Sequence, residues 1–177
     1  MNTAFNAAAS RQEQMAFFNA ADLGDVVQLA AVLAKHPGAA MWHRPVDAGA
    51  IPFSRNETAL MAAAAKNHVP AMRLLLENEA KVNAQTTRGW TALHIAAWEG
   101  HDAAADLLLS FGASTALRTD SDYTAAANAQ LRGHGALAKT IMTSFEKYGL
   151  KFMNGGLPLS VEAPAKAAWK KRAPSKP

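Results

Sequence analysis

The chain has no cysteine among its 177 residues. This absence excludes disulfide bonds, thiolate nucleophiles and zinc sites that depend on cysteine. Aromatic residues are also scarce, at 7%, although half of the residues are hydrophobic. The chain can therefore bury a sizeable core, and we expect that core to be rich in small aliphatic side chains such as alanine.

Long apolar runs are missing as well. No segment approaches the roughly 20 apolar residues that a membrane-spanning helix needs. Residues 1–30 lack a basic start followed by an apolar stretch, which is the pattern of a signal peptide. We therefore expect a soluble, cytoplasmic protein without a membrane span.

The sequence also lacks the common signatures of catalysis. It contains no Gly-x-Ser-x-Gly, no His-Glu-x-x-His and no phosphate-binding glycine loop. Its serine and aspartate residues follow no pattern. We expect neither an enzyme nor a bound cofactor.

The formal net charge of +4 is unevenly distributed along the chain. Residues 1–149 contain 12 Lys and Arg against 13 Asp and Glu, whereas residues 150–177 contain six against one. The basic character therefore belongs to the C-terminal tail. The rest of the chain is nearly neutral and has no obvious stripe for a polyanion.

One short pattern occurs three times at a period of 33 residues. The copies begin at Thr58, Thr91 and Thr124, and a histidine follows each start at the same offset: His68, His101 and His134. An apolar run such as residues 74–76 or 107–109 comes next. A fixed period of this length indicates a stacked repeat architecture.

The copy around residues 83–113 resembles an ankyrin repeat. Its Thr91-Ala92-Leu93-His94 is similar to the family's Thr-Pro-Leu-His, and Gly100-His101 and Gly112-Ala113 match the ends of the two helices. Alanine replaces the family's proline in all three copies, and it is also comfortable in a first helical turn. A degenerate copy at residues 11–37 fits the same template.

This resemblance implies an all-α solenoid of about four helix–turn–helix repeats with projecting loops that resemble β-hairpins. We predict an N-terminal extension at residues 1–10, a repeat domain at 11–149 and a basic tail, expected to be disordered, at 150–177. The repeats are placed at about 11–53, 54–86, 87–119 and 120–147. The first contains an insertion of ten residues relative to the period.

The recurring histidines admit two interpretations. A metal site would need ligands at suitable spacing, and no His pair here has a carboxylate placed to complete zinc coordination. Recurrence at the repeat period instead places the side chains at equivalent positions of successive units. We therefore predict structural hydrogen bonds and no bound metal.

The resemblance also implies where a partner protein would bind. Ankyrin proteins commonly use a concave surface formed by the first helix of each repeat and by the loop tips. Carried over by position, this surface contains nine candidate residues: Lys66, Arg88, Trp90, Ile95, Trp98, Glu99, Tyr123, Leu131 and Arg132.

Trp90 and Trp98 are the strongest of these candidates, because tryptophan is enriched at interface hot spots. For Trp90, packing over the neighbouring turn and contact with a partner are equally plausible. For Trp98 we favour exposure and binding, as part of an apolar strip with Ile95 and Leu131. The insertion holds another tryptophan, Trp42, which with Phe53 is expected to cap the open end of the stack, although a binding loop is the alternative.

Residues 150–177 supply a second candidate surface. Within them, Trp169, Lys170, Lys171 and Arg172 combine an aromatic anchor with positive charge. The leading hypothesis is a module that binds an unidentified protein through the repeats. The alternative is binding of nucleic acid or an anionic surface through the tail, with nucleic acid disfavoured because so small a charge makes binding weak. A monomer is favoured, and the sequence leaves the oligomeric state open.

Overall fold

The computed structural model describes residues 9–45 and 56–148, with side chains up to residue 144. The described segments contain eight α-helices and one short 3₁₀ turn. In chain order these are α1 (Arg11–Leu23), α2 (Val26–Lys35), η1 (Ala39–Met41), α3 (Ala59–Ala65), α4 (Val69–Glu77), α5 (Ala92–Glu99), α6 (Asp102–Ser110), α7 (Ala125–Leu131) and α8 (Gly135–Tyr148).

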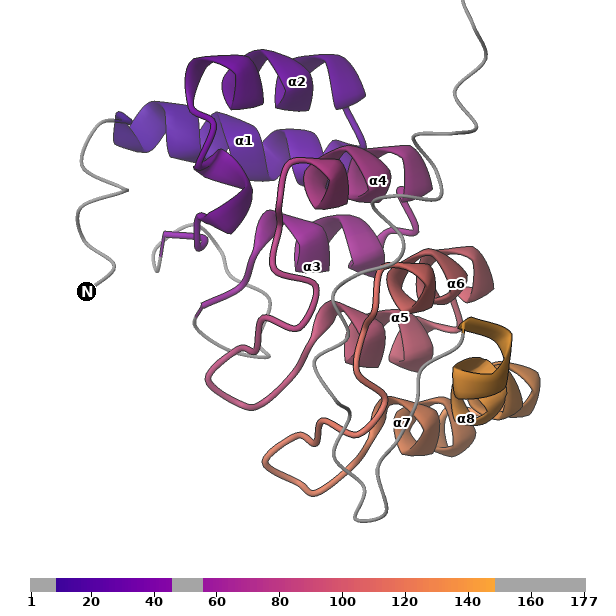
Figure 1. Ribbon diagram of the computed structural model, residues 1–177. Coiled ribbons are helices and arrows are strands. Elements are labelled where there is room, and N and C mark those ends of the chain that lie inside the picture. The colour runs from indigo at the N-terminus through magenta and orange to yellow at the C-terminus, as the bar shows by residue number, and fades with distance from the viewer. Residues whose placement is uncertain (1–8, 46–55, 149–177) are drawn as a thin grey trace, which may run out of the picture.

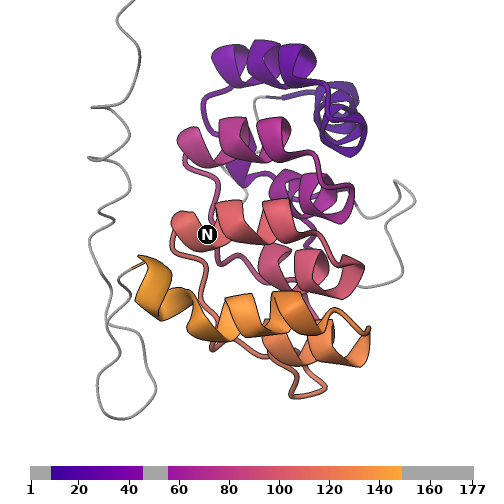
Figure 2. The ribbon, with the colours of Figure 1, turned by 90° about the vertical axis from the view of Figure 1, so that its right-hand side faces the viewer.

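Consecutive helices form four pairs that stack along one axis (Figure 1). The first helices of the pairs form one layer, in which α3 contacts α1 and α5, and α5 contacts α7. The second helices form the other layer, where α4 contacts α2 and α6, and α6 contacts α8 (Figure 2). The predicted all-α solenoid is confirmed, and the long loops before α5 and α7 project from one side.

Threonine at the repeat period starts three of the first-layer helices. The hydroxyl oxygens of Thr58, Thr91 and Thr124 accept hydrogen bonds from backbone amides three residues further on. This satisfies a donor that the helix itself cannot pair. The α5 helix then ends at Gly100, whose φ of 75° is left-handed and costs glycine little.

Small side chains form much of the core between the layers. Most of α3 is alanine, and Ala62, Ala63 and Ala64 are fully buried. Leucines of the second layer, such as Leu75 and Leu108, fill the space between the helices. Because the alanine side chain is a single methyl group, the backbones of adjacent first-layer helices pack closely.

Two of the three recurring histidines, His68 and His101, form the predicted hydrogen bonds between neighbouring units. His68 Nε2 lies 3.0 Å from the carbonyl oxygen of Asp22, and His101 Nε2 lies 3.2 Å from that of Ala65. Among the residues that the structure describes, no group of three or more His, Asp and Glu could hold a metal ion.

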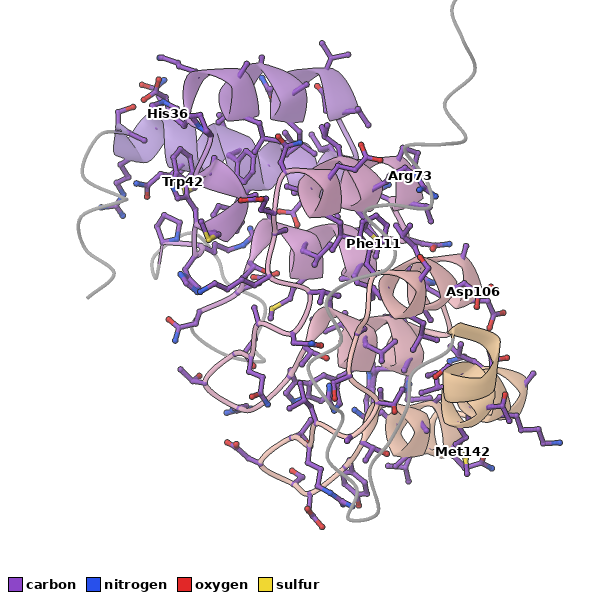
Figure 3. The ribbon with its side chains drawn as sticks, viewed as in Figure 1. His36, Trp42, Arg73, Asp106, Phe111 and Met142 are labelled. Carbon is purple, nitrogen blue, oxygen red and sulfur yellow. The ribbon has the colours of Figure 1, made fainter. Side chains whose placement is uncertain are left out.

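The described part of the insertion packs between the first two units, since η1 contacts both α2 and α3. Trp42 is only 3% exposed and packs edge-to-face on Phe17, with ring centroids 5.5 Å apart. The ring of His36 lies 5.4 Å from that of Trp42 (Figure 3). Trp42 is therefore a buried core residue, but the insertion that carries it lies between the first and second units, so the predicted covering of the open end of the stack is not what these contacts show; Phe53 lies outside the described residues.

Candidate partner-binding surface

Two loop tips with the same backbone geometry lie beside the first-layer helices. In one, the amide of Thr86 bonds to the carbonyl of Trp90; in the next, the amide of Thr119 bonds to the carbonyl of Tyr123. The amide of Asp120 donates to the carbonyl of Arg88, which joins the tips at 3.0 Å. These bonds hold the tips in register, so side chains at their ends have fixed positions relative to α5 and α7.

Three predicted residues meet at one point of this surface. Trp90, which immediately precedes the N-cap of α5, contacts Trp98 near the end of the same helix, with centroids 5.6 Å apart and rings nearly perpendicular. From the next unit, the guanidinium of Arg132 lies over the Trp98 ring, 4.8 Å from its centroid. We call Trp90, Trp98 and Arg132 the Trp–Arg cluster.

Arg132 is held in this place by a second contact. Its Nε donates to the carbonyl oxygen of Trp98 at 3.4 Å, a bond between residues of adjacent units. Stacking and hydrogen bonding together orient the planar guanidinium. Among the described residues, no carboxylate forms an ion pair with it.

The expectation that Trp98 is exposed needs correction. Its side chain is half-buried, because Trp90 packs against it and Arg132 covers one ring face. Trp90 is also half-buried and lies 6.2 Å from the ring of His94. The two tryptophans thus support the neighbouring structure while part of each remains accessible.

The other predicted residues differ in how exposed they are. Leu131 is 59% exposed and Tyr123 is 43% exposed, whereas Ile95 is half-buried against the core. Three charged residues occupy the same position in successive repeats and are all exposed: Lys66, Glu99 and Arg132. Arg88 is exposed at its loop tip. The predicted tail residues 169–172 lie outside the described part of the chain.

A second charged group was not predicted from the sequence. Arg44, from the insertion, forms two hydrogen bonds of 2.9 and 2.8 Å with the carboxylate of Asp22. Its Nε lies 3.0 Å from Glu57 Oε2, and its guanidinium lies over the Phe18 ring. Burial raises the pKa of Glu57, and the charge of Arg44 opposes that shift. No sequence signal connects these residues, because the insertion falls outside the repeat period.

Stacked helix pairs, histidine-linked units and glycine-terminated helices define an α-helical repeat solenoid. A family model for ankyrin repeats, in three copies, matches residues 17–119, which is more than half of the chain. The protein therefore belongs to the ankyrin-repeat family. Comparison with curated proteins found no match. Helices α7 and α8 follow the matched region and continue the stack as a fourth pair.

None of the helices in the described segments is long and apolar enough to cross a membrane.

Proposed function

We propose that this protein is an interaction module that binds a partner protein through the first-layer helices and loop tips of its repeats. Ankyrin repeats generally serve in protein–protein interaction, and the family match supports the general class. The Trp–Arg cluster is the observation that supports this particular surface as the binding site. Two rigid aromatic rings and an oriented guanidinium offer the residue types that dominate interface energetics.

Preorganisation is the physical advantage of this arrangement. Loop tips and helices are already joined by hydrogen bonds between units, such as that from Asp120 to Arg88. Little conformational entropy is therefore lost when a partner binds, and more of the contact energy remains as affinity.

Replacing Trp98 by alanine tests the proposal directly. We expect the variant to fold but to bind a captured partner about 2 kcal/mol more weakly, because a central aromatic contact is lost. Partners would be captured from the native lysate with the full chain, and their affinities then measured by calorimetry. Thermal melting monitored by circular dichroism reports on the fold.

The control is Arg73→Ala. Arg73 lies on α4, in the layer of second helices, as do Asp106 on α6 and Met142 on α8 (Figure 3). Unchanged affinity in folded Trp98→Ala would contradict the proposal.

The alternative, binding of an anionic ligand by the tail, is supported by the six basic residues against one acidic residue in 150–177. Deleting residues 155–177 separates the two functions. The repeat-based function retains most of its affinity after the deletion. The tail-based function loses it, and beforehand shows a steep dependence on salt concentration.

A further inference from the structure

We infer that the Trp–Arg cluster recognises a carboxylate next to an apolar side chain, so that the partner presents a single acidic residue flanked by aliphatic or aromatic residues. This inference rests on the proposed function and specifies the chemistry of its partner. It begins from the state of Arg132, which is oriented by Trp98 and has no carboxylate partner among the described residues.

Three other cations of the described chain form ion pairs and show the contrast. Arg44 pairs with Asp22 and Glu57, Arg118 pairs with Asp122, and Lys35 pairs with Glu13. Arg132 instead uses its Nε on a backbone carbonyl and its face on an indole ring. The terminal amino groups, Nη1 and Nη2, have no hydrogen-bond partner within the described segments. Two parallel donors at one edge of a guanidinium match the two oxygens of a carboxylate.

The surroundings provide the apolar half of the site. Leu131 precedes Arg132 and is 59% exposed, and the guanidinium lies over the half-buried ring of Trp98, which Trp90 contacts edge-on. A carboxylate bound here would leave its neighbouring side chain against these apolar groups. Partial exclusion of water by that side chain would also strengthen the charge-assisted hydrogen bonds.

Acidic residues on the same surface argue against a polyanion. Glu99 follows Trp98 directly and is exposed, and Asp120 and Asp122 are exposed at the adjacent loop tip. A nucleic acid carries a phosphate at every nucleotide, and these carboxylates would repel the phosphates that lie near them. A single carboxylate placed at Arg132 does not meet this repulsion. The protein's own residues 150–177 are also a poor occupant, because they contain one acidic residue against six basic ones.

Selection from a displayed library of random short peptides tests the inference on the full chain. We expect wild-type protein to enrich sequences in which Asp or Glu adjoins a large apolar residue. Enrichment should be lost with Trp98→Ala and with Arg132→Gln, and kept with Arg73→Gln and with a 155–177 deletion. Acidic sequences retained by Arg132→Gln but lost with the deletion bind the tail and overturn the inference.

A double-mutant cycle on one selected peptide then isolates the contact. Arg132→Gln should weaken binding about tenfold, and so should replacement of the peptide's acidic residue by its amide. The two changes together should be little worse than either alone. Arg132→Lys should fall between wild type and Arg132→Gln, because it keeps the charge without the two parallel donors.

Three other results would overturn the inference, and they bear differently on the proposed function. Selected peptides that lack acidic residues but still require Trp98 would leave the proposed function standing. Peptides that bind Trp98→Ala as tightly as wild type would contradict both. Binding of a single-stranded oligonucleotide that is lost in both Trp98→Ala and Arg132→Gln would assign the cluster to nucleic acid instead.

Discussion

His94 shows how one residue can serve a helix cap and the contact between repeats at once. It is fully buried at the start of α5. Its Nδ1 accepts from the amide of Thr91 at 3.3 Å, and its Nε2 lies 3.2 Å from the carbonyl oxygen of Tyr123 in the next unit. These partners require a neutral ring with its proton on Nε2. Protonation of Nδ1 would break the cap.

We predict that His94 titrates below its ordinary value. Burial lowers the pKa of this ring from 6.5 and outweighs the hydrogen bonds to Tyr123 and Leu117, which act in the opposite direction. The unfolded chain therefore takes up a proton near pH 6.5 while the folded chain does not. The stability that depends on neutral His94 is fully present above that pH and is lost as the pH falls below it.

Nuclear magnetic resonance of the imidazole protons measures the pKa directly. Urea unfolding of wild type and His94→Gln between about pH 7 and 5 measures the linkage. The difference in unfolding free energy between the two proteins should shrink as the pH falls. Burial also lowers the pKa of His43, but that residue is common to both proteins and cancels. A His94 pKa of 6.5 or above would contradict the prediction.

Among structural elements, the insertion between α2 and α3 departs most from the repeat template. Its Trp42 is buried against Phe17 of α1. Its backbone contacts the second unit, where the amide of Arg44 donates to the carbonyl of Glu57 at 2.8 Å. The Arg44 side chain then bridges Asp22 of α1 and Glu57 before α3. A segment without a repeat position is thereby attached to two repeats.

Loss of the Arg44 side chain should destabilise the fold strongly. Arg44→Met leaves the carboxyl group of Glu57, whose side chain is 6% exposed, without the cation that offsets its burial. We expect the unfolding free energy to fall by about 3 kcal/mol, as measured by urea denaturation. Arg44→Met with Glu57→Gln should recover part of the loss, because the unpaired carboxyl group is then absent.

Arg118→Ala is the matched control for the buried bridge. Its ion pair with Asp122 is exposed, with side chains 56% and 83% accessible. Such a pair contributes at most about 1 kcal/mol. Equal losses for the two arginine variants would show that the Arg44 bridge is no more important than a surface pair.

At the level of the whole molecule, each unit buries its apolar side chains against the neighbouring unit. The fourth pair, α7 and α8, lies beyond the matched family region but packs on α5 and α6. A side chain at Gly100 would overlap the ring of His134, with its Cβ 2.4 Å from that ring's Cε1. Repeats three and four therefore fit closely, and the stack does not end at residue 119.

A chain that stops at residue 119 should accordingly be less stable than one that stops at 148. The shorter chain loses the Tyr123 carbonyl that accepts from His94 and the cover that α7 and α8 provide. Re-exposing even one buried leucine costs about 2 kcal/mol, so the urea midpoint should fall clearly. The 1–148 chain is the control because it keeps all eight described helices, and equal midpoints would contradict the prediction.

Much of the fold could be predicted because its signals are local and repeat. A threonine cap and a left-handed glycine each act within a few residues of their own position, as at Thr91 and Gly100. Recurrence at 33 residues then specifies how successive units stack, and it predicts the hydrogen bonds that His68 and His101 form between units. Local backbone geometry and periodicity were thus determined by the sequence itself.

Only the tertiary structure decided which side chains meet across units. The sequence indicated Trp98 and Arg132 as candidates but predicted an exposed tryptophan, since nothing local shows that a guanidinium 34 positions later lies over its ring. The bridge from Arg44 to Asp22 and Glu57 likewise depends on how an aperiodic segment crosses two repeats. Such contacts form where segments distant in the sequence pack together. Side-chain rotamers and the distance between the segments determine which residues meet, and no repeating sequence pattern indicates the pair.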